Sequence, residues 1–254
     1  MADEGIPLTG GNMARGIVRI GHTVRKPGGP WTPAVHAFLE HLAGAGFPGC
    51  PRSLGIDEQG RHVLEWIEGT TTNPYQRTPR SPDLHEIGTL LRAFHDAAAE
   101  FMPPAGAVWG TLIPPPATSQ VVHHDLAAWN FVHGGDRPVI IDWDLAGPGD
   151  PLWDIALSVH GFCGIGDAAR GLEDACRDLR TFAAGYGLDE AQRRTLVAMV
   201  PVRLRSLFQH LADGAASATS PWLDMWNNGH GEYWRSAEAL ATRQSPHLLH
   251  ALLA

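Results

Sequence analysis

The chain has 254 residues, 44% of them hydrophobic and 18% charged, which is the composition of a folded protein with room for one large domain or two modest lobes. Its net charge of −8 argues against a nucleic-acid partner, because such binding depends on basic patches. No apolar run approaches the ~18–20 residues of a membrane span, and the start MADEGIPLTGG lacks a secretory signal pattern. The three cysteines are widely spaced and odd in number, as expected of free thiols in a reducing compartment. We therefore expect a cytoplasmic protein with no membrane or nucleic-acid partner.

Residues 8–68 are predicted to form a small sheet-rich lobe. The run IVRIGHTVRK alternates around Gly21-His22, which has the character of a two-residue hairpin turn. PRSLGIDEQGRHVLEWIEG predicts two further strands, joined by a turn at residues 57–60. Between the two hairpins, apolar residues at helical spacing predict an amphipathic helix: Val35, Phe38, Leu39 and Leu42.

The remainder of the chain is predicted to be mostly helical. A polar, proline-rich linker at 71–82 precedes a helical pattern over 83–101, and short strands are expected around 121–143. From Trp153 onward the pattern is again helical. The fold class is therefore α+β, with a small antiparallel sheet lobe at 1–68 and a larger helical lobe at 69–254.

The stretch VVHHDLAAWNFV at 121–132 sets polar residues between apolar ones, where a buried polar group is costly unless it is paired. His123, Asp125 and Asn130 give the spacing H-x-D-x-x-x-x-N, and Asp142 follows at the end of the aliphatic run RPVIID. Phosphoryl transfer needs such groups: a carboxylate to accept a hydroxyl proton, and an amide oxygen with a second carboxylate to hold Mg²⁺. The pattern therefore favours a phosphotransferase.

Two other interpretations of this stretch are open. Asp125 and Asn130 could form an ordinary Asx turn, although Asp142 and its flanking residues fit that interpretation poorly. His123, His124 and His133 could hold a metal, but their spacing matches no zinc-site pattern.

The ordered motifs resemble those of the aminoglycoside phosphotransferase and choline kinase-like family, whose members are related to protein kinases. That family has H-G-D-x-x-x-x-N, then I-D-W-E or similar, then A-G-x-G-D-P-x-x-D-L-A. Here the sequence has HHDLAAWN, IDWD at 141–144 and AGPGDPLWDIA at 146–156. The resemblance implies a protein-kinase-like two-lobe fold and an ATP-dependent kinase that uses Mg²⁺, with GTP not excluded.

Carried over by position, the resemblance implies a role for each motif residue. It makes Asp125 the catalytic base, and Asn130 and Asp142 the magnesium ligands. His123 would shape the catalytic loop without moving a proton. Asp150 and Asp154 would brace that loop by hydrogen bonds, while Asp144 could be a second metal ligand or a structural residue.

The nucleotide-binding residues are implied more loosely. Arg25, on the strand after the first hairpin turn, would contact the α- and β-phosphates, because Lys26 is expected to face the opposite side. Backbone groups at two hinge positions would bind adenine, and a glycine turn would cover the phosphates; these residues are Glu65 and Ile67, and Gly10, Gly11 and Asn12.

One departure from the family concerns the helix after this strand. The family has a glutamate there that pairs with the basic residue, whereas this sequence has Val35 or His36, and Glu40 comes one turn later. The ion pair is therefore expected to be absent or replaced by His36. This departure favours an alternative function, a nucleotide-binding pseudokinase that serves as an immunity or regulatory module.

The acceptor is predicted to be the hydroxyl of a small molecule, an aminoglycoside-like compound or another amino alcohol. The acid excess, most of which falls after residue 72, mildly favours a cationic acceptor, although a solvated acidic surface explains it equally well. Aromatic and acidic residues at 220–234 could form a cation site, but Trp222 and Trp226 have the spacing of packing residues. Trp129 and His124 are candidates to line the acceptor site. A protein kinase is disfavoured because no long activation segment fits between Asp142 and residues 149–151.

Overall fold

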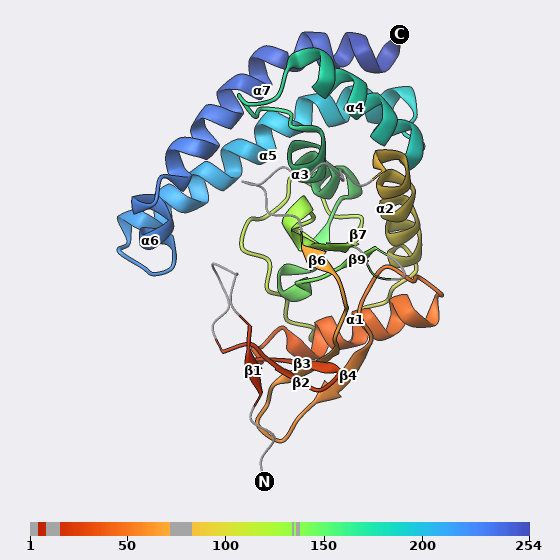
Figure 1. The fold of residues 1–254 in the computed structure, drawn as a ribbon, viewed down its shortest axis with the longest axis vertical. Coiled ribbons are helices and arrows are strands. Elements are labelled where there is room, and N and C mark those ends of the chain that lie inside the picture. The colour runs from red at the N-terminus through yellow and green to blue at the C-terminus, as the bar shows by residue number, and fades with distance from the viewer. Residues whose placement is uncertain (1–4, 9–15, 72–82, 134, 136–137) are drawn as a thin grey trace.

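The computed structural model describes residues 5–8, 16–71, 83–133, 135 and 138–254. A small antiparallel sheet and one helix form the lower part of Figure 1, and a larger assembly of helices forms the upper part. The sheet has the order β1-β2-β3-β5-β4. Its strands are β1 (Ile6–Pro7), β2 (Val18–Ile20), β3 (Thr23–Lys26), β4 (Ser53–Ile56) and β5 (His62–Glu65). The expected α+β class is confirmed.

The turn between β2 and β3 falls at the predicted position. Gly21 has a φ of 58°, which glycine adopts without the steric cost that a Cβ brings. Val24 of β3 packs against the hydrophobic core, so the side chains of Val24 and Lys26 share the inner face of the sheet.

Helix α1 (Thr32–Gly44) lies against this sheet and begins with Pro33 in its first turn, where a proline costs no backbone hydrogen bond. Its apolar face is fully buried, as the i, i+3, i+4, i+7 spacing predicts: Val35, Phe38, Leu39 and Leu42 are at most 1% exposed. Phe38 contacts Phe94 and Trp143 of the larger part, so α1 is packed against both parts of the molecule.

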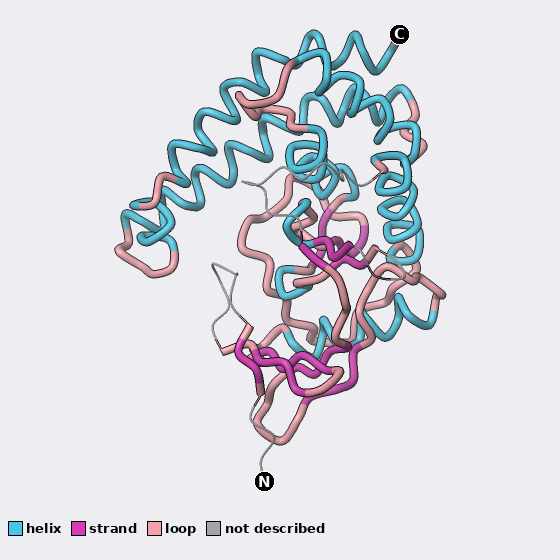
Figure 2. The backbone as a smooth tube through the Cα atoms, in the orientation of Figure 1, coloured by secondary structure: helices cyan, strands magenta, loops and turns pink. Residues whose placement is uncertain are grey.

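The larger part holds two short strand groups among its helices, and Figure 2 shows these strands as magenta segments near the centre of the molecule. β6 (Thr70–Thr71), β8 (Phe131–His133) and β9 (Val139–Ile140) form one sheet, and β7 (Gln120–Val122) pairs with β10 (Gly147–Gly149). The helices are α2 (Leu84–Ala98), α3 (Pro151–Cys163), α4 (Leu172–Tyr186), α5 (Glu190–Ala216), α6 (Trp222–Asn227) and α7 (His230–Leu253).

Side-chain caps fix where several of these helices begin. Asp83 accepts hydrogen bonds from the first turn of α2, and Asp150 does so for α3. Asp189 and Gln192 form a reciprocal capping box at the start of α5. The long helices α5 and α7 lie side by side along the top of Figure 1, and α3 packs beneath α5. No helix in the described part of the chain is both long and apolar enough to cross a membrane.

Candidate active site

The predicted catalytic loop, residues 123–130, connects β7 to β8 and ends in a short 3-10 turn at Ala128–Asn130. Within it, the Asn130 amide nitrogen donates to the Asp125 carboxylate and to the Asp125 carbonyl, both at 2.8 Å. The indole nitrogen of Trp129 lies 3.4 Å from the same carboxylate. Since the Asn130 amide nitrogen faces Asp125, its amide oxygen is directed elsewhere and can act as a ligand.

His123 connects this loop to the segment that carries Asp142. Its Nδ1 accepts from the Asp125 backbone N–H at 3.2 Å, and its Nε2 donates to the Ile141 carbonyl at 3.0 Å. Burial lowers the pKa of His123, so the ring is neutral at physiological pH. A neutral ring with both nitrogens engaged fits a residue that shapes the loop.

Asp154 of α3 holds the same loop from behind. Its two carboxylate oxygens accept from the backbone N–H groups of His123 and His124, each at 2.7 Å, and the side chain is fully buried. This is the bracing contact that the motif comparison implied for Asp154. Asp150 instead caps α3 and contacts Ser119.

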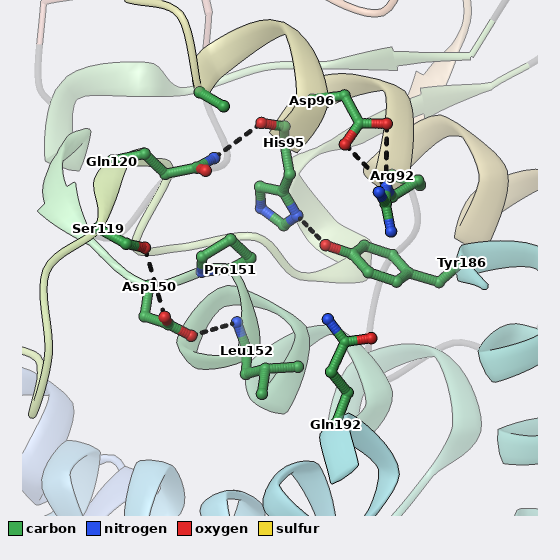
Figure 3. A pocket seen from close by; sticks show the side chains of 11 residues that line it. Arg92, His95, Asp96, Ser119, Gln120, Asp150, Pro151, Leu152, Tyr186 and Gln192 are labelled. Carbon is green, nitrogen blue, oxygen red and sulfur yellow. Dashed lines mark hydrogen bonds and ion pairs between the residues drawn. The ribbon is translucent and has the colours of Figure 1, made fainter. Parts of the chain in front are cut away.

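Behind the loop lies a pocket of about 290 Å³, which Figure 3 shows from close by. Tyr186 contacts His95 at 2.8 Å, and His95 in turn lies 3.5 Å from Asp154. Of the motif residues, Asp150 lines this pocket, whereas Asp125, Asn130 and Asp142 do not. The pocket therefore borders the contacts that brace the loop and lies apart from the candidate catalytic and metal-binding residues.

Lys26 of β3, and not Arg25, lies beside the candidate metal ligand. Its ammonium is 2.5 Å from an Asp142 oxygen and 2.9 Å from an Asp144 oxygen. Strand alternation directs Arg25 to the face opposite the one that Val24 and Lys26 share. The contact of Arg25 with the phosphates stays a prediction.

The aliphatic strand predicted to end at Asp142 ends two residues earlier, at Ile140. Asp142 then adopts a left-handed backbone conformation, with a φ of 64°, and a 3-10 turn follows at Trp143–Leu145. This turn, and not strand alternation, brings the Asp142 and Asp144 carboxylates together on Lys26.

The charges of this group shift one another's pKa values. Burial, reinforced by the nearby Asp142 carboxylate, raises the pKa of Asp125 to about 6. Burial acts in the same direction on Asp142, but Lys26 outweighs it and holds the Asp142 pKa below its usual range. Asp142 is thus ionised at neutral pH, while Asp125 is close to the pKa that suits a general base.

The helix residue that the family uses as a partner of the basic residue does not contact Lys26 here. Val35 is buried in the core, and His36 Nδ1 lies 2.7 Å from the Ser53 hydroxyl, with Glu40 3.4 Å from the other ring nitrogen. The same hydroxyl lies 2.6 Å from His62. The carboxylates that pair with Lys26 among the described residues are those of Asp142 and Asp144, and neither residue is on this helix.

His62 is expected to make the stability of the protein depend on pH. Burial, with His36 and Lys26 nearby, lowers its pKa to about 4, so the unfolded chain binds the proton more readily between pH 6.5 and 4. The contribution of neutral His62 to the free energy of unfolding is fully present above pH 6.5. It is lost as the pH falls to about 4, and this loss is at most ~3 kcal/mol. Urea unfolding of His62→Gln should show a weaker loss over this range than the unaltered protein. His85→Gln, which changes an exposed histidine, should show the full loss.

The structure does not decide the role of the other predicted nucleotide-binding residues. The Glu65 N–H donates to the Arg52 carbonyl, and the Trp66 N–H donates to the His22 carbonyl. These two backbone N–H groups are therefore already hydrogen-bonded within the small lobe. The adenine contacts at Glu65 and Ile67 stay predictions. Gly10, Gly11 and Asn12 lie outside the described residues.

The aromatic residues near the C-terminus serve packing. Trp222 lies over Gly214 and contacts His210, and Trp226 lies over Gly231 with Phe208 at 6.0 Å between ring centroids. Asp224 accepts from Ser220, and Glu232 bonds Arg235 and Ser236. The contacts of Trp222 and Trp226 fit the packing role that their spacing predicts. A cation site at 220–234 stays the alternative interpretation.

One residue of the site was missed by the sequence analysis. Arg203 of α5 is only 2% exposed and donates to the His124 carbonyl of the catalytic loop. A polar residue within the long helical pattern of 190–216 gives no sign that it is buried, and 79 residues separate it from His124.

Comparison with known proteins agrees with this geometry. A model of the phosphotransferase enzyme family matches residues 106–196. A trifolitoxin immunity protein from Rhizobium leguminosarum bv. trifolii is 34% identical over 215 residues, covering 76% of this chain and 77% of that protein.

Two solved structures have a similar fold. A choline/ethanolamine kinase family protein from Mesorhizobium loti superimposes with a TM-score of 0.65 at 19% identity, covering 100% of this chain and 94% of the other. An amicoumacin kinase in complex with AMP-PNP, Ca²⁺ and Ami superimposes with a TM-score of 0.65 at 11% identity, covering 94% of this chain and 89% of the other. The chain thus has the protein-kinase-like two-lobe fold and belongs to the phosphotransferase enzyme family.

Proposed function

We propose that the protein is an ATP-dependent kinase that phosphorylates a hydroxyl group of a small molecule. One observation supports this most: Asn130 and Asp125 are hydrogen-bonded within one loop, the Asp142 carboxylate is near enough to raise the pKa of Asp125, and Lys26 of the sheet lobe pairs with Asp142. Residues 1–68 would form the nucleotide-binding lobe, and residues 69–254 would supply the catalytic loop and the acceptor site.

The oxygen donors fit a magnesium ion held partly by its substrate. Asp142 offers a carboxylate and Asn130 an amide oxygen, which are hard ligands of the kind Mg²⁺ prefers. The described residues contain no group of three or more His, Cys, Asp or Glu side chains arranged for a metal, so phosphate oxygens and water would complete the shell. When bound, the ion would neutralise charge on the phosphates.

The side chains of the chain itself supply the remaining steps. Asp125 accepts the proton of the acceptor hydroxyl and orients its oxygen toward the γ-phosphate. Lys26 places a positive charge at the phosphates, and His123 and Asp154 keep the loop in shape. Trp129, in contact with the Asp125 carboxylate, would border the acceptor.

An amino alcohol is the favoured class of acceptor. Structures of the same fold include a choline/ethanolamine kinase family protein and an aminopropanol kinase. A cationic acceptor also agrees with the net charge of −8.

The proposal is tested by binding and by turnover. ATP with Mg²⁺ should stabilise the protein against heat, by about 2.7 kcal/mol at a concentration 100-fold above Kd, and ATP with EDTA should stabilise it much less. ADP release should then appear with at least one member of a panel of amino alcohols and aminoglycosides, and the same assays with GTP would define the nucleotide. Stabilisation without transfer to any acceptor would contradict a kinase function.

A second candidate is a nucleotide-binding module that confers immunity without phosphoryl transfer. It is supported by the name of the relative, a trifolitoxin immunity protein, and by the helix residue that does not pair with Lys26. The two candidates differ in one result: protection of a sensitive cell by an Asp125→Asn variant would favour the non-catalytic module, and loss of protection would favour the kinase.

A further inference from the structure

Arg203 is a buried cation that donates to no carboxylate among the described residues. Its guanidinium donates to the His124 carbonyl at 2.5 Å and to the Ser206 hydroxyl at 3.3 Å. Its Nε has no acceptor among the described residues, and the guanidinium carbon, Cζ, lies 4.7 Å from the centroid of the Trp153 ring. Burying a guanidinium in this way costs stability, so stability alone does not account for an arginine here.

The carbonyl that Arg203 binds belongs to a residue with an unusual backbone. His124 has a φ of 67°, a conformation that costs an L residue other than glycine about 1 kcal/mol or more. The family motif quoted above, H-G-D, has glycine at this position, whereas this chain has histidine. The left-handed conformation must therefore be held by contacts.

Three contacts hold His124, on its backbone N–H, its ring Nε2 and its carbonyl, while its ring Nδ1 has no partner among the described residues. Its backbone N–H donates to Asp154 at 2.7 Å, and its ring Nε2 donates to the Pro148 carbonyl at 3.1 Å. Arg203 binds the third group, the carbonyl of the peptide bond that joins His124 to Asp125. Rotation of this peptide would turn Asp125, the next residue, away from its present direction.

The charge of Arg203 also suits its position. Burial lowers its pKa to about 10, and the Asp125 and Asp154 carboxylates oppose that shift. The guanidinium therefore stays protonated at neutral pH and keeps all its donors.

We propose that Arg203 is a positioning residue of the active site: it holds the His124 carbonyl, keeps His124 in the left-handed conformation and thereby directs Asp125 toward the acceptor hydroxyl. This inference rests on the proposed kinase function.

The test compares Arg203→Met and Arg203→Lys with Arg193→Met in the full-length protein. Arg193 is a matched control, because it is on the same helix about 15 Å away and also donates to backbone carbonyls, those of Leu188 and Leu252. In the ADP-release assay, R203M should lower kcat by about 100-fold and leave the KM for ATP within about twofold. R203K, whose ammonium can still donate to the carbonyl, should recover part of the loss, and R193M should keep kcat.

A double-mutant cycle with His124→Gly tests the route through His124. Glycine adopts a positive φ without strain, so R203M should lower kcat by about 10-fold or less in the H124G background. An equal loss in both backgrounds would overturn the proposal, as would an unchanged kcat in R203M.

Hydrogen exchange separates this inference from the proposed function. The amides of residues 123–125 should exchange faster in R203M than in the unaltered protein, and R193M should leave them unchanged. If the unaltered protein transfers phosphate to no acceptor, the proposed function fails, and unchanged exchange in R203M would then overturn the positioning role as well. Melting temperatures of each variant identify any that fail to fold.

Discussion

Replacing Asp125 by alanine is expected to lower kcat by about 10²–10⁴-fold, the usual contribution of a general base. The KM for ATP should change little, because Asp125 is not among the groups proposed to hold the nucleotide or the metal. Asp125→Asn should lose nearly as much activity, since its amide can still accept the hydrogen bond from Asn130 but cannot accept the hydroxyl proton. Steady-state kinetics with saturating acceptor measure both effects.

Controls for this experiment are available in the same chain. Asp213→Asn alters an exposed carboxylate on α5 that accepts only a surface hydrogen bond from Gln209, and it should retain full activity. Thermal stabilisation of D125A by ATP with Mg²⁺ should equal that of the unaltered protein. Undiminished turnover in D125A would remove Asp125 from the mechanism.

Replacing Lys26 by methionine is expected to reduce kcat/KM for ATP by about 10²–10³-fold, as removal of a preorganised charge from the reacting groups does in other enzymes. Methionine matches the length of lysine and tolerates the buried stem, so the loss reports mainly the charge. Lys26→Arg, which keeps the charge but changes its shape, should retain intermediate activity.

Arg25→Met is the matched control for Lys26, because it removes a basic side chain from the next position on the same strand. It should keep kcat/KM within about twofold of the unaltered protein, since strand alternation directs Arg25 away from Asp142. A larger loss in R25M than in K26M would restore Arg25 as the phosphate contact. Melting temperatures should accompany both variants, because K26M leaves two neighbouring carboxylates without their partner.

Local patterns in the sequence were sufficient to predict much of the fold. The turn at Gly21, the apolar face of α1 and the cap at Asp83 each depend on residues a few positions apart, whose physical preferences act locally. The motif from His123 to Asp142 could likewise be recognised in the sequence, because its spacing is set by one loop and one short strand.

The sequence analysis predicted the alternation of β3 correctly but did not use Val24 to decide which face is the inner one. Alternation fixes only that Arg25 and Lys26 face opposite sides, and the side that each takes depends on which neighbour faces the core. Val24 is the apolar residue of this strand and packs inward, so Lys26, two positions later, shares its face.

Other contacts could not be predicted from sequence patterns. Asp144 reaches Lys26 through a 3-10 turn that the sequence analysis did not predict, and Arg203 reaches His124 from a helix far along the chain. Both depend on tertiary packing, which the periodicity of a segment does not record.

The ion pairs of Lys26 affect the charge of the site before its substrates bind. Two carboxylates held close together repel each other, and Lys26 supplies an internal counter-ion that compensates them. If Asp142 holds a divalent cation in the loaded protein, as proposed, Lys26 would be free to pair with the phosphates of the nucleotide. Until then, Lys26 would keep these two carboxylates from facing each other without a counter-ion.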